Sequence, residues 1–472
     1  RAMLTPRTSV DTMVGPERAP FVAQSAIPAA LVPTRVLEFP MHRDGARQPC
    51  ASIWSTQDFV REDDQAMDYR KAAEETRSDV IAFAQKLIQT PSTSGQEGDL
   101  AQLMIAEMKK LNYDEAFIDD MGNTVGVVRG TGGEGAVNIM FNCHMDHVDP
   151  GREDAWEYPP YGGVIDKGYI HGRGASDVEG AIASEIYAVG LMKKLGLKTK
   201  GDLIVTGVVQ EEPAERFGMK HLMDVTFPAN GLKCDFVILG EATSLNVYLG
   251  HRGRAELEVQ TFGRTSHGSA PWRGINAVYK MLPVIEGVKE LDPRLPPHEF
   301  LGKSTIALTI ISCSPGRLSI IPDICTVSLD RRFLPSETID DAIRQIEDIF
   351  ARIRETDPEF KATVKVREVE EVSYKGVSGM CRKVMEPWIT PRNHPYVEKT
   401  LEALREIGAD PQVGRWDFGT DGSYTAGVLG IPTIGYSPGE EHYAHTPYDR
   451  VNIEYIMESV AGTMAIAKKV AG

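Results

Sequence analysis

The stretch Cys143–Asp149 (CHMDHVD) contains residue types that bind metals or move protons. The preceding residues, 136–142, are apolar and favour a buried strand, so His144 should lie at a strand end, where ligands gather in open α/β sheets. His144 could therefore coordinate a metal through one ring nitrogen, while Asp146 fixes the ring or holds the loop. The simpler alternative is a hydrogen-bonded structural pair.

Carboxylates follow two further apolar runs. Glu211 and Glu212 come directly after a strand-like run, 203–209, and Glu241 follows another, 237–240. Two adjacent carboxylates at the end of a buried strand raise each other's pKa unless a cation neutralises them. A metal together with a proton-transfer role would remove that cost, whereas a solvated acidic loop would need neither.

A glycine-rich corner at residues 170–180 supplies another candidate, Asp177. Its glycines let the backbone pass closely, and a helix is predicted over 181–195, so Asp177 stands at a strand-to-helix corner. In that position the carboxylate could point both oxygens at a cation. The alternative is an N-cap of the following helix.

Composition limits the function classes. The 472 residues are 42% hydrophobic and 25% charged, as in an ordinary globular protein, and allow two domains. The net charge of −16 argues against nucleic acid or an anionic membrane as a partner. No apolar run approaches the roughly 18 residues of a membrane helix. The six scattered cysteines contain no CxxC pair and favour a reducing, cytoplasmic compartment.

Changes of pattern along the chain predict its domain organisation. Residues 1–66 are rich in Pro, Arg, Ser and Ala without a sustained period, and are expected to be a poorly ordered extension; a targeting leader is the alternative. Helices and strands alternate from residue 67 onward. The segment 252–368 reads strand, helix, strand, strand, helix, strand, which is the order of a ferredoxin-like α+β insert.

The candidate residues, together with a late histidine, occur in the order found in the M20 family of metallopeptidases and deacylases, which the chain resembles from about Met67 onward. The family includes acetylornithine deacetylase, succinyl-diaminopimelate desuccinylase and glutamate carboxypeptidase, and this chain is most similar to the selenium-metabolism-linked hydrolases. The resemblance implies a mixed-sheet zinc-peptidase catalytic domain, residues 67–251 and 369–472. A lid and dimerisation domain, residues 252–368, would interrupt it.

The resemblance also implies a site for two Zn²⁺ ions, for which Co²⁺ or Mn²⁺ could substitute. His445 is preferred to His442 as the late ligand because it directly precedes a short turn that contains proline. Asp177 would bridge the two ions. The expected ligands are His144, Asp177 and Glu241 for one ion, and Asp177, Glu212 and His445 for the other.

Catalytic roles follow from the same resemblance. Glu211 would be the general base, which takes a proton from the attacking water and passes it to the leaving amine. Asp146 would orient His144. In the segment 264–271, His267 would stabilise the oxyanion in the site of the partner subunit of a homodimer.

Substrate contacts are expected from the insert. Arg332 matches an arginine that binds a substrate carboxylate, with Arg331 as the competing choice. Asn276 could contact the substrate, although an N-cap of the next helix is the alternative. Ser319 stands where many relatives have asparagine, which would alter the hydrogen bonds made to the substrate.

The expected function is zinc-dependent hydrolysis of the amide bond of a small N-acyl amino acid or dipeptide, with a metal-activated water and Glu211 as base. A carboxypeptidase or dipeptidase of the same family is the alternative reaction. A catalytically silent metal-binding scaffold is the alternative from another class, although no expected ligand is missing. A serine hydrolase is excluded because Pro438, after Ser437 in the GxSxG match, has no N–H to donate.

Overall fold

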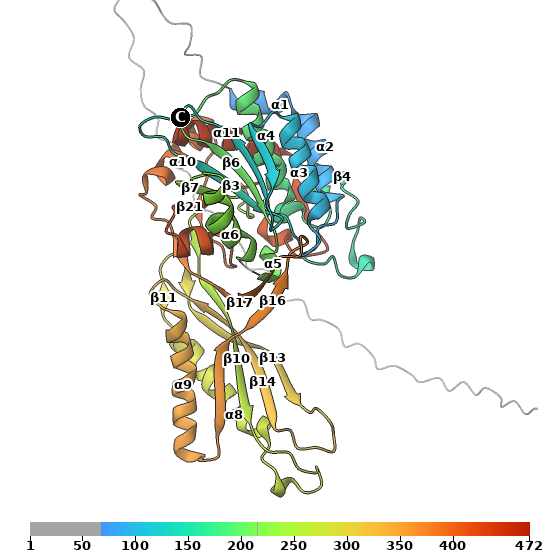
Figure 1. The fold of residues 1–472 in the computed structure, drawn as a ribbon, viewed down its shortest axis with the longest axis vertical. Coiled ribbons are helices and arrows are strands. Elements are labelled where there is room, and N and C mark those ends of the chain that lie inside the picture. The colour runs from blue at the N-terminus through green and yellow to red at the C-terminus, as the bar shows by residue number, and fades with distance from the viewer. Residues whose placement is uncertain (1–67, 215) are drawn as a thin grey trace, which may run out of the picture. The chain divides into compact units, whose positions relative to one another are not determined.

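The computed structural model describes residues 68–214 and 216–472, all within one compact unit, 66–472 (Figure 1). The extension predicted over residues 1–66 lies outside the described residues. Among the helices that are described, none is long and apolar enough to cross a membrane.

The main sheet has eight strands in the order β1-β2-β6-β3-β7-β21-β8-β20. Its central strands, β3 (Ile139–His144), β6 (Leu203–Val208) and β7 (Phe236–Leu239), run parallel and are fully buried. Continuous apolar runs of this kind suit a sheet that is covered on both faces. Because parallel strands end at the same edge, the polar residues after these three strands come together. The other strands are β1 (Glu115–Ile118), β2 (Thr124–Val128), β8 (Val247–Tyr248), β20 (Val413–Gly414) and β21 (Thr433–Gly435).

Helices cover this sheet and form the largest core. Helix α4 (Gly180–Lys194) is buried at every position from Gly180 to Met192, because it packs against both α2 and α11. A second apolar cluster includes Met219, Leu222 and Phe227 of the segment that follows β6. The helices are α1 (Tyr69–Glu74), α2 (Arg77–Ile88), α3 (Gly98–Lys110), α5 (Glu211–Ala214), α6 (Phe217–His221), α7 (Phe227–Ala229), α10 (Pro395–Glu406) and α11 (Ile453–Ala471).

The second sheet has the order β13-β14-β10-β15 and a core of its own (Figure 1). Along β10 and β14 buried and partly exposed residues alternate, so one face of this sheet packs against α8 and α9. The predicted α/β fold with a ferredoxin-like insert is confirmed. The elements follow the predicted order: β10 (Gly253–Phe262), α8 (Ala277–Leu291), β13 (Thr305–Ser314), β14 (Ile324–Phe333), α9 (Ile339–Thr356) and β15 (Lys361–Val366).

Short strands join distant parts of the chain. β22 (Arg450–Asn452) pairs with β5 (Tyr169–His171), which brings the loop after Gly435 next to the glycine-rich corner. β18 (Val384–Met385) pairs with β10 where the chain returns to the main sheet. The remaining strands are β4 (Val164–Asp166), β9 (Gly250–His251), β11 (Pro297–His298), β12 (Gly302–Lys303), β16 (Glu368–Val372), β17 (Ser378–Arg382) and β19 (Trp388–Ile389).

Candidate active site

The ends of β3, β6 and β7 open into a cavity of about 290 Å³. All five predicted metal ligands line it, as do the predicted base and the predicted carboxylate-binding arginine. The lining also contains the apolar side chains of Met385, Phe418 and Ala444 and one further carboxylate, that of Glu441. The predicted residues in the lining are His144, Asp177, Glu211, Glu212, Glu241, Arg332 and His445.

Asp177 lies between two histidines. The Nε2 atom of His144 is 3.0 Å from its Oδ1, and the Nε2 atom of His445 is 3.1 Å from its Oδ2. A third pair joins Glu212 Oε1 to His445 Nε2 at 2.9 Å, and Glu241 Oε1 is 3.7 Å from His144 Nε2. A carboxylate whose two oxygens face different ligand sets has the arrangement of a bridging ligand between two metals.

The potential ligand atoms form two groups. His144, Glu211 and Glu241 have ligand atoms within 4.8 Å of one another, and so do Asp177, Glu212 and His445. Imidazole nitrogens and carboxylate oxygens in sets of three fit a divalent transition metal such as Zn²⁺. The donor set of this chain therefore fits two metal ions.

Burial and charge shift the pKa values of these groups. Burial raises the pKa of Glu211, and the charge of Glu241 raises it further. Burial likewise raises the pKa of Glu241. Burial alone would lower the pKa of His144, but the hydrogen bond to Asp177 and nearby carboxylates raise it well above its usual value. Hydrogen bonds to Asp177 and a second carboxylate raise the pKa of His445 to about 10. These shifts all favour the protonated forms, and bound divalent cations would take the place of those protons among the carboxylates.

Asp146 contacts both the histidine and the carboxylate loop. Its backbone carbonyl is 2.6 Å from Nδ1 of His144, which leaves Nε2 to face the cavity. Its buried carboxylate is 3.9 Å from that ring and instead accepts the N–H of Glu211 at 2.9 Å and the N–H of Glu212 at 3.2 Å. The Ser94 hydroxyl also donates to it, at 2.6 Å. The ring is therefore oriented by the Asp146 backbone, whereas the side chain fixes the loop.

Sequence reasoning missed the support behind this loop. In the structure Glu97 is fully buried, and its Oε1 accepts the N–H of Gly95 at 2.9 Å and that of Gln210 at 3.2 Å. Burial raises the pKa of Glu97, and the nearby charge of Asp146 raises it further, to about 7. The only signal in the sequence was a carboxylate at a helix start, which is common elsewhere.

Asp449 joins the two segments that carry Asp177 and His445. Its Oδ2 accepts the N–H of Gly174 at 2.8 Å, and its Oδ1 accepts the N–H of Ser176 at 3.0 Å. Burial raises its pKa to about 7. This buried residue holds the glycine-rich corner against the late histidine loop.

Two arginines reach the cavity from neighbouring strands. Arg332 of β14 and Arg254 of β10 are directly opposite in the antiparallel register. Asp330 accepts from Arg332 through Nε at 2.7 Å and Nη2 at 3.1 Å, and Arg254 donates to Glu256 at 2.8 Å. The competing choice, Arg331, is fully buried and does not line the cavity. Arg254 was missed because only the strand register places it beside Arg332.

Besides Asp146, three predicted site residues do not line the cavity in this chain: His267, Ser319 and Asn276. His267 is exposed, with Nδ1 2.7 Å from the hydroxyl of Ser269. Asn276 caps α8 by accepting N–H groups of its first turn, which is the alternative given above. The carbonyl of Ser319, in the β13–β14 loop, accepts the N–H of Gly268 at 2.7 Å.

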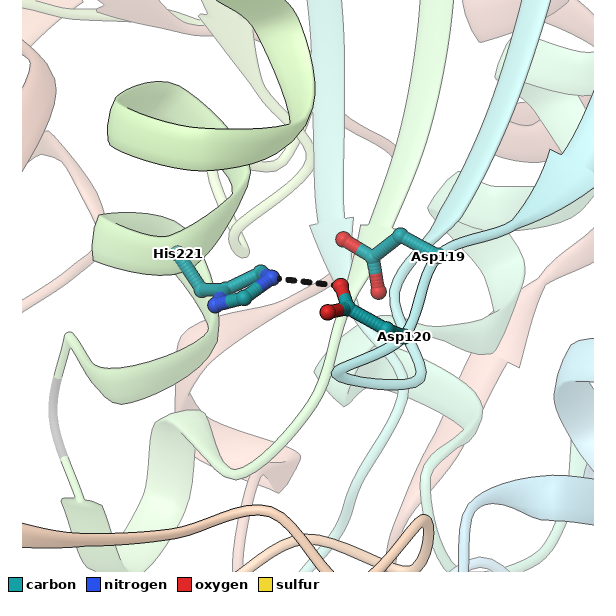
Figure 2. Close-up of side chains that lie close together, drawn as sticks. All are labelled: Asp119, Asp120 and His221. Atoms are coloured by element: carbon teal, nitrogen blue, oxygen red, sulfur yellow. Dashed lines mark hydrogen bonds and ion pairs between the residues drawn. The ribbon is translucent and has the colours of Figure 1, made fainter. Parts of the chain in front are cut away.

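A third group of potential ligands lies elsewhere (Figure 2). Asp119 is buried, and its carboxylate already accepts two backbone N–H groups, both at 2.8 Å, and the Thr226 hydroxyl at 2.6 Å. Asp120 is exposed and pairs with His221 at 2.8 Å. The Asp119 carboxylate is saturated by these hydrogen bonds. This group therefore fastens a loop and does not offer a set of ligand atoms to a metal.

Comparisons with known proteins agree with this site. Residues 140–469 match the sequence profile of peptidase family M20/M25/M40. The uncharacterized protein YgeY of Escherichia coli (strain K12) is 33% identical over 396 residues, which cover 84% of this chain and 95% of that protein. N-formyl-4-amino-5-aminomethyl-2-methylpyrimidine deformylase of Bacillus subtilis (strain 168) is 26% identical over 427 residues, which again cover 84% of this chain and 95% of that protein.

Solved structures share the fold. Aminopeptidase PepT from Bacillus cereus has a TM-score of 0.65 at 20% identity, over 84% of this chain and 99% of that chain. The Bacillus subtilis YXEP protein is described as a dinuclear metal binding peptidase from the M20 family. It has a TM-score of 0.62 at 13% identity, over 84% of this chain and 100% of that chain. With the profile match and the 33% identical relative, these findings show that the chain belongs to peptidase family M20 and is a metal-dependent amidohydrolase.

Proposed function

We propose that this protein uses two zinc ions to hydrolyse the amide bond of a small N-acyl amino acid or dipeptide. The observation that supports this most directly is the position of Asp177, whose two carboxylate oxygens face His144 and His445 separately. Glu241 would complete the set around one ion and Glu212 the set around the other. When bound, the ions would polarise the scissile carbonyl and lower the pKa of the attacking water.

Glu211 is the proposed proton carrier. It is buried at the cavity, and Asp146 fixes its backbone N–H, so its carboxylate has a defined place beside the proposed metal ligands. It would accept a proton from the attacking water as the new C–O bond forms. It would then donate that proton to the amine nitrogen as the C–N bond breaks.

Arg332 is the proposed contact for the substrate carboxylate. Asp330 engages its Nε and Nη2 atoms and so fixes the guanidinium plane. Its Nη1 donates to no acceptor within residues 68–214 and 216–472 and would remain available for an anion. The apolar side chains of Met385 and Phe418 in the same lining would contact the uncharged part of the substrate.

We assign residues 252–368 as a lid that also forms a homodimer. Strand β13 is an edge of the second sheet, and its Ile310 and Ile311 are exposed, as is Tyr279 on α8. Exposed apolar residues on an edge strand favour pairing with another chain. A second copy would also explain why His267 is exposed and absent from the cavity of its own chain.

Mixed dimers test the role of His267. A His267→Ala protein and a Glu211→Ala protein would each have little activity. After mixing, a dimer with one of each chain keeps one site that has both an intact base and an intact histidine, so activity should partly return. If subunits exchange but no activity returns, His267 does not act across the dimer.

The function itself is tested on a mixed pool of N-acyl amino acids and dipeptides. Zinc- or cobalt-loaded protein should release amines, and Glu211→Ala should bind metal but release almost none. Asp120→Ala is a matched control, because it removes an exposed carboxylate outside the cavity and should keep full activity. Release from dipeptides alone would identify a dipeptidase, and release of C-terminal residues from longer peptides a carboxypeptidase. Silence with both metals bound would overturn the proposal.

A further inference from the structure

Two cysteines lie directly opposite each other in the second sheet. The antiparallel register pairs Cys313 of β13 with Cys325 of β14. Opposite residues in such a pair have Cα atoms about 4.5–5.5 Å apart and side chains on the same face of the sheet. A disulfide spans Cα separations of about 4.4–6.8 Å. The two strands therefore already hold these residues at the backbone spacing of a disulfide.

The two thiols differ in access. In the single chain Cys313 is exposed on the edge strand, whereas Cys325 is fully buried. Burial, and then the nearby Cys313, raise the pKa of Cys325. Within residues 68–214 and 216–472, Cys143, Cys234 and Cys381 have no cysteine as a strand partner. The exposed thiol would therefore react first and the buried one would follow.

The pair closes the base of a hairpin tip, residues 314–324, that contacts the His267 loop. The Ser319 carbonyl in this tip accepts the N–H of Gly268, and Ile320 forms a β-bridge with His267. A covalent bond at the base of the tip would restrain the segment on which His267 rests.

We propose that Cys313 and Cys325 form a reversible disulfide with each other on exposure to a low-molecular-weight disulfide. With oxidised glutathione, the Cys313 thiolate attacks one sulfur and releases one glutathione thiolate, which gives a mixed disulfide. Cys325 loses its proton and attacks the Cys313 sulfur, which releases the second glutathione. The protein gives up two electrons and two protons, and one glutathione disulfide becomes two glutathione thiols.

Peptide mapping tests the bond without any substrate. Trypsin cuts after Lys303, Arg317 and Arg331, so the two cysteines fall in separate peptides, 304–317 and 318–331. After folded protein is treated with oxidised glutathione and free thiols are blocked, these two peptides should be recovered joined. The thiol count in denaturant should fall by two from six, and dithiothreitol should restore it.

Variants identify the partners. Cys313→Ser should lose no thiol, whereas Cys234→Ser, the matched control, should still give the joined peptides. Digestion of the folded protein at the exposed Arg317 should be several-fold slower after oxidation, because the tip is restrained. The proposal is overturned by separate peptides with all six thiols, by a stable glutathione adduct on Cys313 alone, or by 304–317 joined to a second copy of itself. None of these outcomes depends on the proposed hydrolase activity.

Discussion

Replacing Asp146 by alanine separates the two roles that this residue can have. The carboxylate accepts three hydrogen bonds, from the N–H of Glu211, the N–H of Glu212 and the Ser94 hydroxyl. Asp146→Ala removes all three, yet leaves in place the backbone carbonyl that orients His144. Any loss of function then reports on the carboxylate loop and not on the histidine.

The expected cost follows from these contacts. The hydroxyl of Ser94 can rotate to another acceptor, but the two backbone N–H groups at Glu211 and Glu212 cannot. A buried donor left without a partner costs about 1–3 kcal/mol, so Asp146→Ala should lose about 2–6 kcal/mol of unfolding free energy. A shift of about 1 Å in a catalytic group can reduce the rate about 100-fold, and we expect a loss of that order in kcat/KM.

Asp119→Ala is the matched control, because Asp119 is also buried and also accepts backbone N–H groups and a threonine hydroxyl, but outside the cavity. Urea unfolding should show similar losses of stability for the two variants, measured with metal bound. Amine release by folded protein should fall for Asp146→Ala only. Turnover of Asp146→Ala within about twofold of the unchanged protein, or equal loss in Asp119→Ala, would refute this reasoning.

Three further outcomes are expected. Burial raises the pKa of Glu185 to about 8, so the stability that its protonated form contributes is lost as pH rises from 4.5 towards 8. In urea unfolding, Glu185→Gln should therefore stabilise the protein by up to about 5 kcal/mol at pH 8.5 but little at pH 4.5. Equal effects at both pH values would contradict this. Burial lowers the pKa of His251 to about 4, so the free energy of unfolding should fall by up to about 3 kcal/mol as pH drops from 6.5 to 4. His251→Gln should flatten this dependence on pH, and an unchanged slope would show that other groups cause it. Chelation should abolish amine release and lower Tm by the equivalent of about 3 kcal/mol for metal at 100 times its Kd, both reversed by Zn²⁺, whereas identical melting curves would argue against bound metal.

The strand-end residues could be predicted because each follows an apolar run. His144 ends one buried strand, Glu211 and Glu241 follow two others, and these parallel strands bring their ends to one edge. The insert could also be predicted from its hydrophobic pattern, which changes between strand and helix periods in the order of a ferredoxin-like domain. Its first helix begins directly after Asn276, whose side chain caps it.

What could not be predicted depends on choices between nearby partners. The sequence places Asp146 two residues from His144, but cannot say whether its carboxylate contacts the ring or the N–H groups of a loop 65 residues away. The pairing of Arg254 with Arg332 depends on strand register, which alternation alone does not fix. The Asp330 contact to Arg332 was within reach, because residues two apart on a strand share a face.

The distance along the chain between the ligands has a consequence for biosynthesis. Glu212 and His445 meet across 233 residues, and the whole second sheet is encoded between them. During translation from the N-terminus, His144, Asp177 and Glu241 are therefore made well before His445. Neither set of the proposed ligands is held in place until the chain after the insert is made, because Asp449 fixes the corner that carries Asp177, and His445 itself follows the insert. We therefore expect metal loading at the proposed site to be a late event in the synthesis of each chain.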